Sequence, residues 1–367
     1  MIADYSCRLP KSGAYGWGVC SENLRRELKT YGVHTNEART LDEIVVSSEV
    51  CLSAVSDHNF QYTSSILGKK NIGYGFIENN IAGEKMSYYG ERLWDHIVCG
   101  STWMQHWLNP KLSIPTSVAI QGVDFDVFHF NEGDENNSSA FTVGSFGKFE
   151  FRKGQDLVIK AVSILQERYD DIELVYNWHN DWPNLIREFA WNQNAAVRMM
   201  YSVDNEFYKA NETEFFRSTL QANKVKNSHN AYRSWLDSQY RSCDVILFPN
   251  RCEAGTNLCL MEALACGVPC IVTDATGHTD ITRRETYPYK DLLLTCGEEA
   301  TFMQGDRYLG RWYKPCLDEI VSKLEQAYRM RDELRKRREN ASRMFSDLTW
   351  SSTAHGIFDS MRSLAYN

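Results

Sequence analysis

Short apolar runs alternate with helix-like segments along most of this 367-residue chain. The strand-like runs are DEIVVSSEVCLSAV, KKNIGYGFIE, DHIVCGS, FTVGSFG, IELVYNW, CDVILFP and PCIVTDA, and the helix-like segments include CSENLRRELKTYG, GQDLVIKAVSILQERY and LCLMEALACG. Strands that alternate with helices indicate βαβ units and parallel sheets. Because the chain is too long for one ordinary hydrophobic core, we expect two α/β halves, with the cleft between them as the natural ligand site.

One segment in the first half of the chain has the composition of an interdomain linker. FNEGDENNSSA, residues 130–140, is acidic, rich in amides and almost free of apolar residues, and a new strand-like run with a glycine turn follows it. We therefore predict a first domain over residues 1–130, a linker over 131–140 and a second domain over 141–344. The irregular, aromatic and polar stretch at about 181–230 indicates an insertion in the second domain.

The composition is that of a soluble globular protein, with 43% apolar and 24% charged residues. No run approaches the roughly 20 apolar residues that span a bilayer, and the N-terminus lacks the regions of a signal peptide. The eleven cysteines are scattered and several lie in apolar runs, which fits a reducing compartment. We expect a cytoplasmic protein.

The charge balance argues against one class of partner. A net charge of −8 and a pI near 5.7 disfavour nucleic acid as a main partner. The basic cluster Arg335-Lys336-Arg337-Arg338 is interleaved with acidic residues. We interpret it as a solvated helix face, with peripheral contact to a membrane surface as the alternative.

The segment FPNRCEAGTNLCLMEALACGVPCIV, residues 248–272, carries the most specific pattern in the chain. A buried strand stops at Pro249, and Glu253 follows at the carboxyl end of that strand, where open parallel sheets bind their ligands. Gly255 then allows a turn, Thr256 is the predicted N-cap of the next helix, and Gly267 closes that helix. A helix start aimed into a cleft suits phosphate or another anion.

Two carboxylates in this segment have two readings. Each can accept two hydrogen bonds from neighbouring hydroxyl groups, so Glu253 on the loop and Glu262 on the helix suit a hydroxyl-rich ligand. Alternatively, Glu253 is a surface loop charge and Glu262 an exposed helix residue.

The same segment resembles the donor-binding motif of retaining GT-B glycosyltransferases of the GT4-like family, also known as glycosyltransferase group 1. EALACGVPCIV matches the A-x-G-x-P-x-I of that motif, although eight residues separate Glu253 from Glu262 where the family usually has seven. The resemblance implies two Rossmann-like, doubly wound domains facing each other across a cleft. It also implies transfer of a sugar from a nucleotide-diphosphate donor, such as a UDP- or GDP-sugar, to an acceptor hydroxyl with retention of configuration and no required metal.

The resemblance assigns roles to residues of this segment. Glu253 would hold sugar hydroxyls, and Glu262 would accept a hydrogen bond from the ribose. The remaining donor-binding positions are Gly255, Thr256, Asn257 and Leu258. The acceptor would be a glycan, a glycolipid or a glycoprotein.

GKFEFRKGQDLVIKAV, residues 147–162, places cations beside another strand end. Lys148 and Lys153 there can neutralise a diphosphate and stabilise it as it leaves, although lone lysines are often merely solvated. The stretch resembles the family segment G-R-x-x-x-x-K-G, in which Lys153 matches the family lysine and Lys148 replaces an arginine. A lysine cannot bind phosphate through two N–H groups as the family arginine does, and Arg152 is the residue that could compensate for this loss.

SGAYGWGVCSENLRREL, residues 12–28, is rich in glycine and opens a helix. A nicotinamide-binding fingerprint requires a clear strand before it and G-x-G-x-x-G spacing. MIADYSCRLPK reads as a poor strand and the spacing differs, so that interpretation is disfavoured. The stretch resembles instead the N-terminal glycine loop of GT-B enzymes, which implies that Gly16 and Gly18 bind the donor diphosphate and that Trp17 walls the cleft.

The remaining features are three strand-end or loop motifs and the C-terminal segment. Glu78, in NIGYGFIENN, follows a strand and could orient an acceptor hydroxyl, although a glutamate at a strand end is often only solvated. Asp124 and Asp126, in VDFDVF, form an Asp-x-Asp that we interpret as structural. His278 lies at a strand-end loop and is interpreted as a local structural residue. FSDLTWSSTAHGIF resembles the family's C-terminal helix, so residues 345–367 should pack back on the first domain.

Two other functions remain compatible with the sequence. One is a GT-B sugar-nucleotide epimerase, which would turn over sugar nucleotides without an acceptor. The other is a non-catalytic protein that binds a sugar nucleotide or a glycan and has kept the fold.

Overall fold

The computed structural model describes most of the chain. The described residues are 3–10, 16–36, 45–55, 60–61, 66–80, 90–133, 138–179, 225–227, 233–295, 297–304 and 307–366. The insertion predicted at about 181–230 lies outside them except for residues 225–227, and so does the middle of the predicted linker.

The first half of the chain builds a six-stranded parallel sheet in the order β2-β1-β3-β4-β5-β6. Its strands are β1 (Tyr5–Arg8), β2 (His34–Thr35), β3 (Val45–Ala54), β4 (Ile66–Gly75), β5 (His96–Cys99) and β6 (Thr116–Val118). The helices described here are α1 (Gly16–Lys29), α3 (Thr102–Leu108) and the short 3-10 helix η1 (Asn109–Lys111).

The first of these strands corrects the sequence analysis. MIADYSCRLPK reads as a poor strand because polar residues interrupt its apolar ones, yet Tyr5–Arg8 forms β1 inside the sheet. Parallel partners on both sides, β2 and β3, bury this strand so that Cys7 is fully enclosed. Tertiary pairing therefore outweighs the weak local β-propensity.

The second half builds another six-stranded parallel sheet, in the order β12-β11-β10-β7-β8-β9. Its strands are β7 (Phe141–Lys148), β8 (Ile172–His179), β9 (Val225–Asn227), β10 (Val245–Phe248), β11 (Cys270–Thr273) and β12 (Leu293–Leu294). Its helices are α4 (Gln155–Arg168), α8 (Arg233–Arg241), α9 (Leu258–Ala265), α10 (Thr279–Thr282), α11 (Leu317–Arg329) and α12 (Arg331–Arg343), with the 3-10 turns η2 (Phe151–Lys153), η4 (Thr276–His278) and η5 (Lys290–Leu292).

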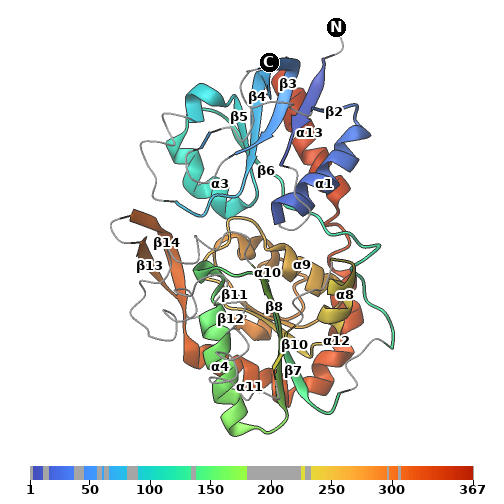
Figure 1. The fold of residues 1–367 in the computed structure, drawn as a ribbon, viewed down its shortest axis with the longest axis vertical. Coiled ribbons are helices and arrows are strands. Elements are labelled where there is room, and N and C mark those ends of the chain that lie inside the picture. Colours follow the sequence, from blue (N-terminus) through green and yellow to red (C-terminus); the bar gives the residue numbers. More distant parts are fainter. Residues whose placement is uncertain are drawn as a thin grey trace.

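An antiparallel hairpin stands outside both parallel sheets. It consists of β13 (Gly297–Gln304) and β14 (Arg307–Pro315), which pair only with each other among the described strands. Figure 1 shows it at one side of the second domain, directed toward the first.

The last helix, α13 (Trp350–Tyr366), crosses from the second domain back to the first (Figure 1). Its apolar residues Trp350, Ala354, Ile357 and Met361 join the core formed by β1, β3, β4 and α1. At the crossing, a Cβ on Gly122 would overlap the backbone of Trp350, so only glycine allows this approach. The expected two Rossmann-like domains and the returning helix are thus confirmed.

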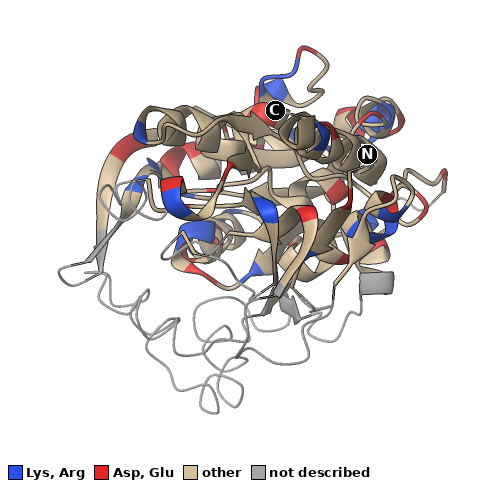
Figure 2. Ribbon diagram, turned by 90° about the horizontal axis from the view of Figure 1, so that it is seen from above, with Lys and Arg blue, Asp and Glu red and all other residues tan. Residues whose placement is uncertain are grey.

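In Figure 2, Lys and Arg are interspersed with Asp and Glu along the described part of the chain. On α12 several arginines are paired within the protein: Arg331 and Arg335 bind Asp244, at 2.8 and 3.2 Å, and Arg337 lies 3.3 Å from Asp291. Arg338 is buried and donates to the backbone of α8, so the interpretation of this cluster as a solvated helix face is wrong for Arg338. No helix among the described residues is long and apolar enough to cross a membrane.

Candidate functional site

The order of strands in the second sheet fixes where its ligand site should lie. From β7 the chain continues to β8 on one side, whereas β10 lies on the other side. The loops that follow β7 and β10 therefore separate at a topological switch point, where open α/β sheets leave a crevice for ligands. One of these loops carries Lys148, Arg152 and Lys153, and the other carries Glu253.

Three cations and three glutamates meet at this switch point. They are Lys148, Arg152, Lys153, Glu78, Glu150 and Glu253. The guanidinium of Arg152 lies at the centre of the cluster. Its Nε lies 2.7 Å from Glu150 Oε2 and its Nη1 lies 3.1 Å from Glu253 Oε2. Its Nη2 lies 3.4 Å from Glu78 Oε1, which comes from the first domain.

The two lysines occupy the outer ends of this cluster. Lys148 Nζ lies 2.5 Å from Glu150 Oε1. Lys153 forms an ion pair with Glu253, and the Asn250 side-chain amide donates to the same carboxylate oxygen. With Arg152 on the other oxygen, three side-chain donors approach the Glu253 carboxylate.

Electrostatics keep Glu253 ionised although it is buried. Burial acts to raise the pKa of Glu253, but the charges of Lys153 and Arg152 outweigh it and lower that pKa to about 2. Glu150 follows the same pattern, since its pKa is lowered against burial by Arg152 and Lys148. Burial opposes the charge of Arg152 itself, and the three surrounding carboxylates nevertheless raise the pKa of Arg152 well above its usual value.

A second, fully buried ion pair holds the two loops together. Arg251 donates to both carboxylate oxygens of Asp156 at 2.8 Å and to the carbonyl of Phe151 at 2.6 Å. Its guanidinium also lies 4.0 Å from the centre of the Phe151 ring. Gly154 makes the turn between Lys153 and α4 with φ of +74°, and a Cβ there would overlap the Pro249 carbonyl. Arg152 and Lys153 are therefore fixed against the loop of Glu253.

The start of α9 lies at the contact between the domains. Leu258 packs against the core of the first domain, and a Cβ on Gly255 would meet Phe76 of that domain at 2.9 Å. The first N–H groups of a helix have no partner within it and carry a partial positive charge. This helix start therefore offers amide groups and positive potential at the interdomain boundary.

The predicted N-cap is wrong by one residue. Asn257 caps α9 with φ of +65° and without a side-chain cap bond, while the Thr256 hydroxyl contacts the Met261 sulfur at 2.9 Å. Asn257 is held instead by His278, whose Nε2 lies 3.3 Å from the Asn257 amide nitrogen. Since His278 Nδ1 lies 3.0 Å from the Thr273 carbonyl, which can only accept, Nδ1 carries the proton and Nε2 accepts from Asn257.

Other candidate positions lie apart from the cation–glutamate cluster. Glu262 is 1% exposed, so it is not the exposed helix residue of the alternative reading, and it accepts a 3.0 Å hydrogen bond from Tyr240 on α8. Gly16 begins α1 with open space where a Cβ would stand, and Gly18 is buried in the same turn. Trp17 packs edge-on against Phe76 at 5.0 Å between ring centres.

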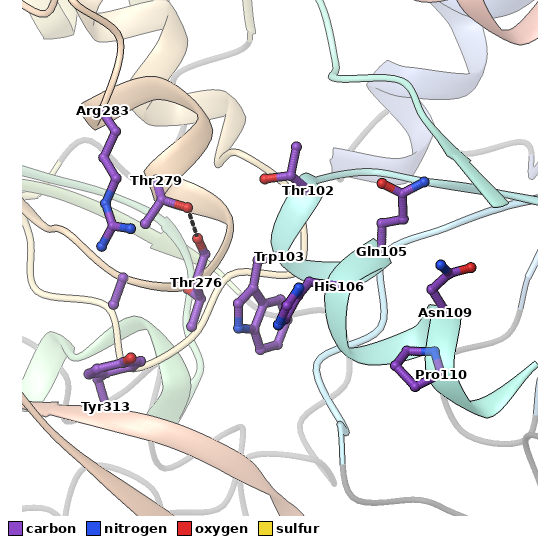
Figure 3. Close-up of a pocket in the computed structure, with 11 residues that line it drawn as sticks. Thr102, Trp103, Gln105, His106, Asn109, Pro110, Thr276, Thr279, Arg283 and Tyr313 are labelled. Carbon is purple, nitrogen blue, oxygen red and sulfur yellow. Dashed lines mark hydrogen bonds between the residues drawn. The ribbon is translucent and has the colours of Figure 1, made fainter.

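A cavity of ≈ 710 Å3 opens between the domains beside α3 (Figure 3). Trp103 and His106 line it from α3, and Thr276, Arg283 and Tyr313 line it from the second domain. In Figure 3 the rings of Trp103 and His106 lie close together, while Arg283 and Tyr313 lie on the opposite side. A ligand site between the domains was expected, but none of the residues that line this cavity was among the candidate site residues.

Sequence reasoning also missed three contributors to the site. Glu150 stands between Lys148 and Arg152 in GKFEFRKG, and this alternation of charge was the available signal. Asp156 and Arg251 are 95 positions apart and meet only in the fold. His278, interpreted from the sequence as a local structural residue, contacts and positions a candidate donor-binding residue, Asn257. Among the described residues, no three metal-ligand side chains cluster as an ion site would need.

Residues 140–305 match the family model described as Glycosyl transferases group 1. No curated protein sequence matches the chain. Sucrose-phosphate synthase (tll1590) from Thermosynechococcus elongatus superposes with a TM-score of 0.65 and 13% identity, over 98% of each chain. HepE (Alr3699) from Anabaena, in complex with UDP and glucose, gives a TM-score of 0.65 and 12% identity over 98% of this chain and 100% of its own.

A glycosyltransferase from Rickettsia africae ESF-5 also superposes with a TM-score of 0.65, at 11% identity over 99% of each chain. At identities of 11–13%, these similarities establish the fold of this chain and not its substrates. Residues 140–305 thus match a glycosyltransferase group 1 domain, and the whole chain has the fold of the GT-B glycosyltransferases.

Proposed function

We propose that this protein is a glycosyltransferase that moves a sugar from a nucleotide-diphosphate donor to an acceptor hydroxyl, with retention of anomeric configuration and without a metal. The acceptor would belong to a glycan, a glycolipid or a glycoprotein. One observation carries the proposal: Arg152, Lys153 and Glu253 meet at the switch point of the second sheet.

The charge balance of the cluster suggests how a donor would bind. Three cations face three carboxylates, so the cluster is neutral as a whole. A diphosphate competes with Glu253 for Lys153 and Arg152, because phosphate oxygens are strong acceptors for both side chains. Each cation that turns to the diphosphate frees a lone pair of Glu253, which can then accept a hydrogen bond from a sugar hydroxyl.

The same exchange would lower the barrier to transfer. The bond between the anomeric carbon and the phosphate oxygen breaks, the nucleoside diphosphate leaves with the electron pair, and the acceptor oxygen bonds to that carbon while its proton passes to the departing diphosphate oxygen. Negative charge develops on the leaving diphosphate, where Lys153, Arg152 and the amides at Asn257 and Leu258 would stabilise it. Lys148, paired with Glu150, would add to this positive field.

The choice of a first donor probe follows from the comparisons. The HepE structures from Anabaena were solved in complex with UDP and with UDP-glucose. UDP-glucose is therefore the first donor to test for this chain, followed by a panel of other UDP- and GDP-sugars.

Two substitutions test the assignment. We expect Lys153→Ala and Glu253→Ala each to lower turnover about a hundredfold, as loss of one charge-stabilising contact does. Lys336→Ala, at an exposed position on α12, is the matched control and should keep the wild-type rate. Circular dichroism establishes that each variant is folded, and wild-type rates in both site variants would reject the assignment.

The rival functions are separated by one assay. An epimerase converts sugar nucleotides without any acceptor, so acceptor-free turnover to an isomeric sugar nucleotide would favour it. Tight binding of a sugar nucleotide with neither transfer nor hydrolysis would favour a binding protein. Acceptor-dependent release of the nucleoside diphosphate supports the transferase.

A further inference from the structure

We propose that the cavity between α3 and β14 is the acceptor subsite, and that it takes a neutral or anionic carbohydrate. This inference rests on the transferase function proposed above. The volume of ≈ 710 Å3 lies within the roughly 300–1,000 Å3 of small-molecule sites. Because both domains line the cavity, an occupant would contact both.

One lining residue, Thr276, connects the cavity directly to the donor cluster. Thr276 is buried there, and its hydroxyl accepts a 3.0 Å hydrogen bond from the backbone N–H of Glu253. Thr276 also has φ of +53°, a conformation that costs free energy in a β-branched residue. Such a conformation persists where the surrounding contacts impose it, and here the hydrogen bond to the Glu253 N–H is one of those contacts.

The hairpin joins the cavity to the donor cluster by a second route. Tyr313 of β14 lines the cavity, and its neighbour Trp312 donates from Nε1 to the Glu78 carbonyl at 3.0 Å. Asn80 bonds the backbone of Arg311 on the same strand, accepting from its N–H at 2.7 Å and donating to its carbonyl at 3.2 Å. The hairpin thus holds the loop of Glu78.

Glu78 consequently occupies the junction between the two sites. Its carboxylate lies 3.4 Å from Arg152, which also binds Glu253. Its loop is held on the other side by η1, because Lys111 donates to the Asn80 carbonyl, and η1 itself lines the cavity through Asn109. Glu78 therefore joins the donor cluster to two elements that line the cavity, η1 and β14, and on this proposal its carboxylate would accept a hydrogen bond from the acceptor hydroxyl.

The lining indicates the chemistry of the occupant. Trp103 and Tyr313 offer an aromatic ring from each domain, which suits the apolar face of a sugar ring. His106 and Arg283 add polar groups, and the Arg283 side chain is 65% exposed beside Asp274. None of the described residues that line the cavity is acidic, and the adjoining carboxylates of Asp274 and Asp280 already bind Arg283 and Thr102, so the lining favours a neutral or anionic occupant over a cationic one.

Fluorine NMR tests binding at the cavity directly. The full-length protein is labelled with 5-fluorotryptophan, and the Trp103 resonance is assigned with Trp103→Phe. Methyl glycosides of glucose, galactose, mannose and N-acetylglucosamine are then added in the presence of UDP. We expect at least one of them to shift the Trp103 resonance saturably.

Kinetics then test the role with matched controls. The methyl glycoside that binds serves as the acceptor, and acceptor-free hydrolysis of UDP-glucose reports the donor site. Trp103→Ala and Tyr313→Ala should raise the KM for the glycoside at least about fivefold, as loss of one well-packed aromatic contact does, and leave hydrolysis unchanged. Trp235→Ala and Tyr366→Ala, at side chains 61% and 69% exposed, should change neither rate.

Trp103 also packs against two hydrophobic cores, so Trp103→Ala removes packing as well as the proposed contact with the glycoside. A third variant therefore tests the cavity without removing a packed side chain. His106→Trp fills the cavity from an exposed position and should block the glycoside without removing a contact. If UDP-glucose is hydrolysed but no glycoside shifts Trp103, or if His106→Trp retains the wild-type KM, the subsite is overturned and the transferase stands. If no sugar nucleotide is bound, hydrolysed or transferred, the proposed function fails and this inference falls with it.

Discussion

Two buried titratable residues at the site, Glu253 and His278, differ in ionisation at pH 7: the first is charged and the second is neutral. Glu253 is ionised because two cations outweigh burial, which leaves its pKa at about 2. Burial lowers the pKa of His278 to about 4, and the nearby charge of Glu253 opposes this only in part. His278 is therefore neutral at pH 7, as its contacts with Thr273 and Asn257 require.

The lowered pKa of His278 predicts acid destabilisation in a defined window. The unfolded chain binds a proton near the ordinary value of 6.5 and the folded protein only near 4, so the stability contribution is complete above pH 6.5 and is lost as pH falls toward 4. We expect a loss of at most roughly 3 kcal/mol from this group. Urea unfolding at pH 7.5, 6 and 5 measures it.

Two histidine variants isolate the effect. His278→Asn should flatten the decline between pH 6.5 and 4, whatever it does to stability at pH 7.5. His34→Asn, at a side chain that is 75% exposed, should keep the wild-type decline. An unchanged decline in His278→Asn would show that other groups cause the acid sensitivity.

The sequence predicts the residues at this site better than their contacts. Lys153 and Glu253 could be named because each follows a strand, and parallel strands bring their carboxyl ends to one edge of the sheet. The ion pair between Lys153 and Glu253 could not be predicted from the sequence, because the two residues lie on loops 100 positions apart in the chain. The N-cap was misplaced because Asn257 adopts a left-handed conformation that His278 supports from a separate loop.

At the scale of elements, α13 shows how one helix depends on a distant sheet. Its buried face packs on α1 and β3 of the first domain, although it follows the second domain in sequence. Thr353 anchors its first turn by donating to the Ile120 carbonyl at 2.7 Å. The helix therefore ties the chain's end to its beginning.

A core substitution in α13 should destabilise the first domain. Ile357 is fully buried, so Ile357→Ala should lower the free energy of unfolding by about 2–5 kcal/mol through lost burial and the cavity left behind. Ser351→Ala, at an exposed position of the same helix, should change it by less than about 0.5 kcal/mol. Equal effects of the two substitutions in urea unfolding would contradict the packing described.

Elements with a continuous apolar or helical pattern were predictable, and elements without one were not. The apolar runs of β7, β10 and β11 and the helical patterns of α4 and α9 are read directly from their sequences. β1 is as short as β10 but was missed because polar residues interrupt its apolar ones, so that its stability comes from pairing with two flanking strands. The β13–β14 hairpin was not anticipated, and it is this element that links Glu78 to the second domain.

At the scale of the whole molecule, the site exists only when both domains are in contact. Ser101 of the first domain donates to the Ala254 carbonyl at 2.5 Å, and Asp280 accepts from the Thr102 N–H at 2.7 Å. These contacts flank the loop of Glu253, while Glu78 reaches Arg152 from the first domain. The GT-B architecture followed from the motif and the alternation of strands and helices, whereas the pairing of surfaces across the domains has no local sequence signal.

The most direct test of the account is a crystal structure of the protein in complex with UDP-glucose. We expect the diphosphate to lie between the domains, within hydrogen-bonding distance of Lys153, Arg152 and the amide of Leu258. Glu253 should then have exchanged its contact with Lys153 for sugar hydroxyls. A diphosphate bound elsewhere, with Lys153 still paired to Glu253, would contradict the account.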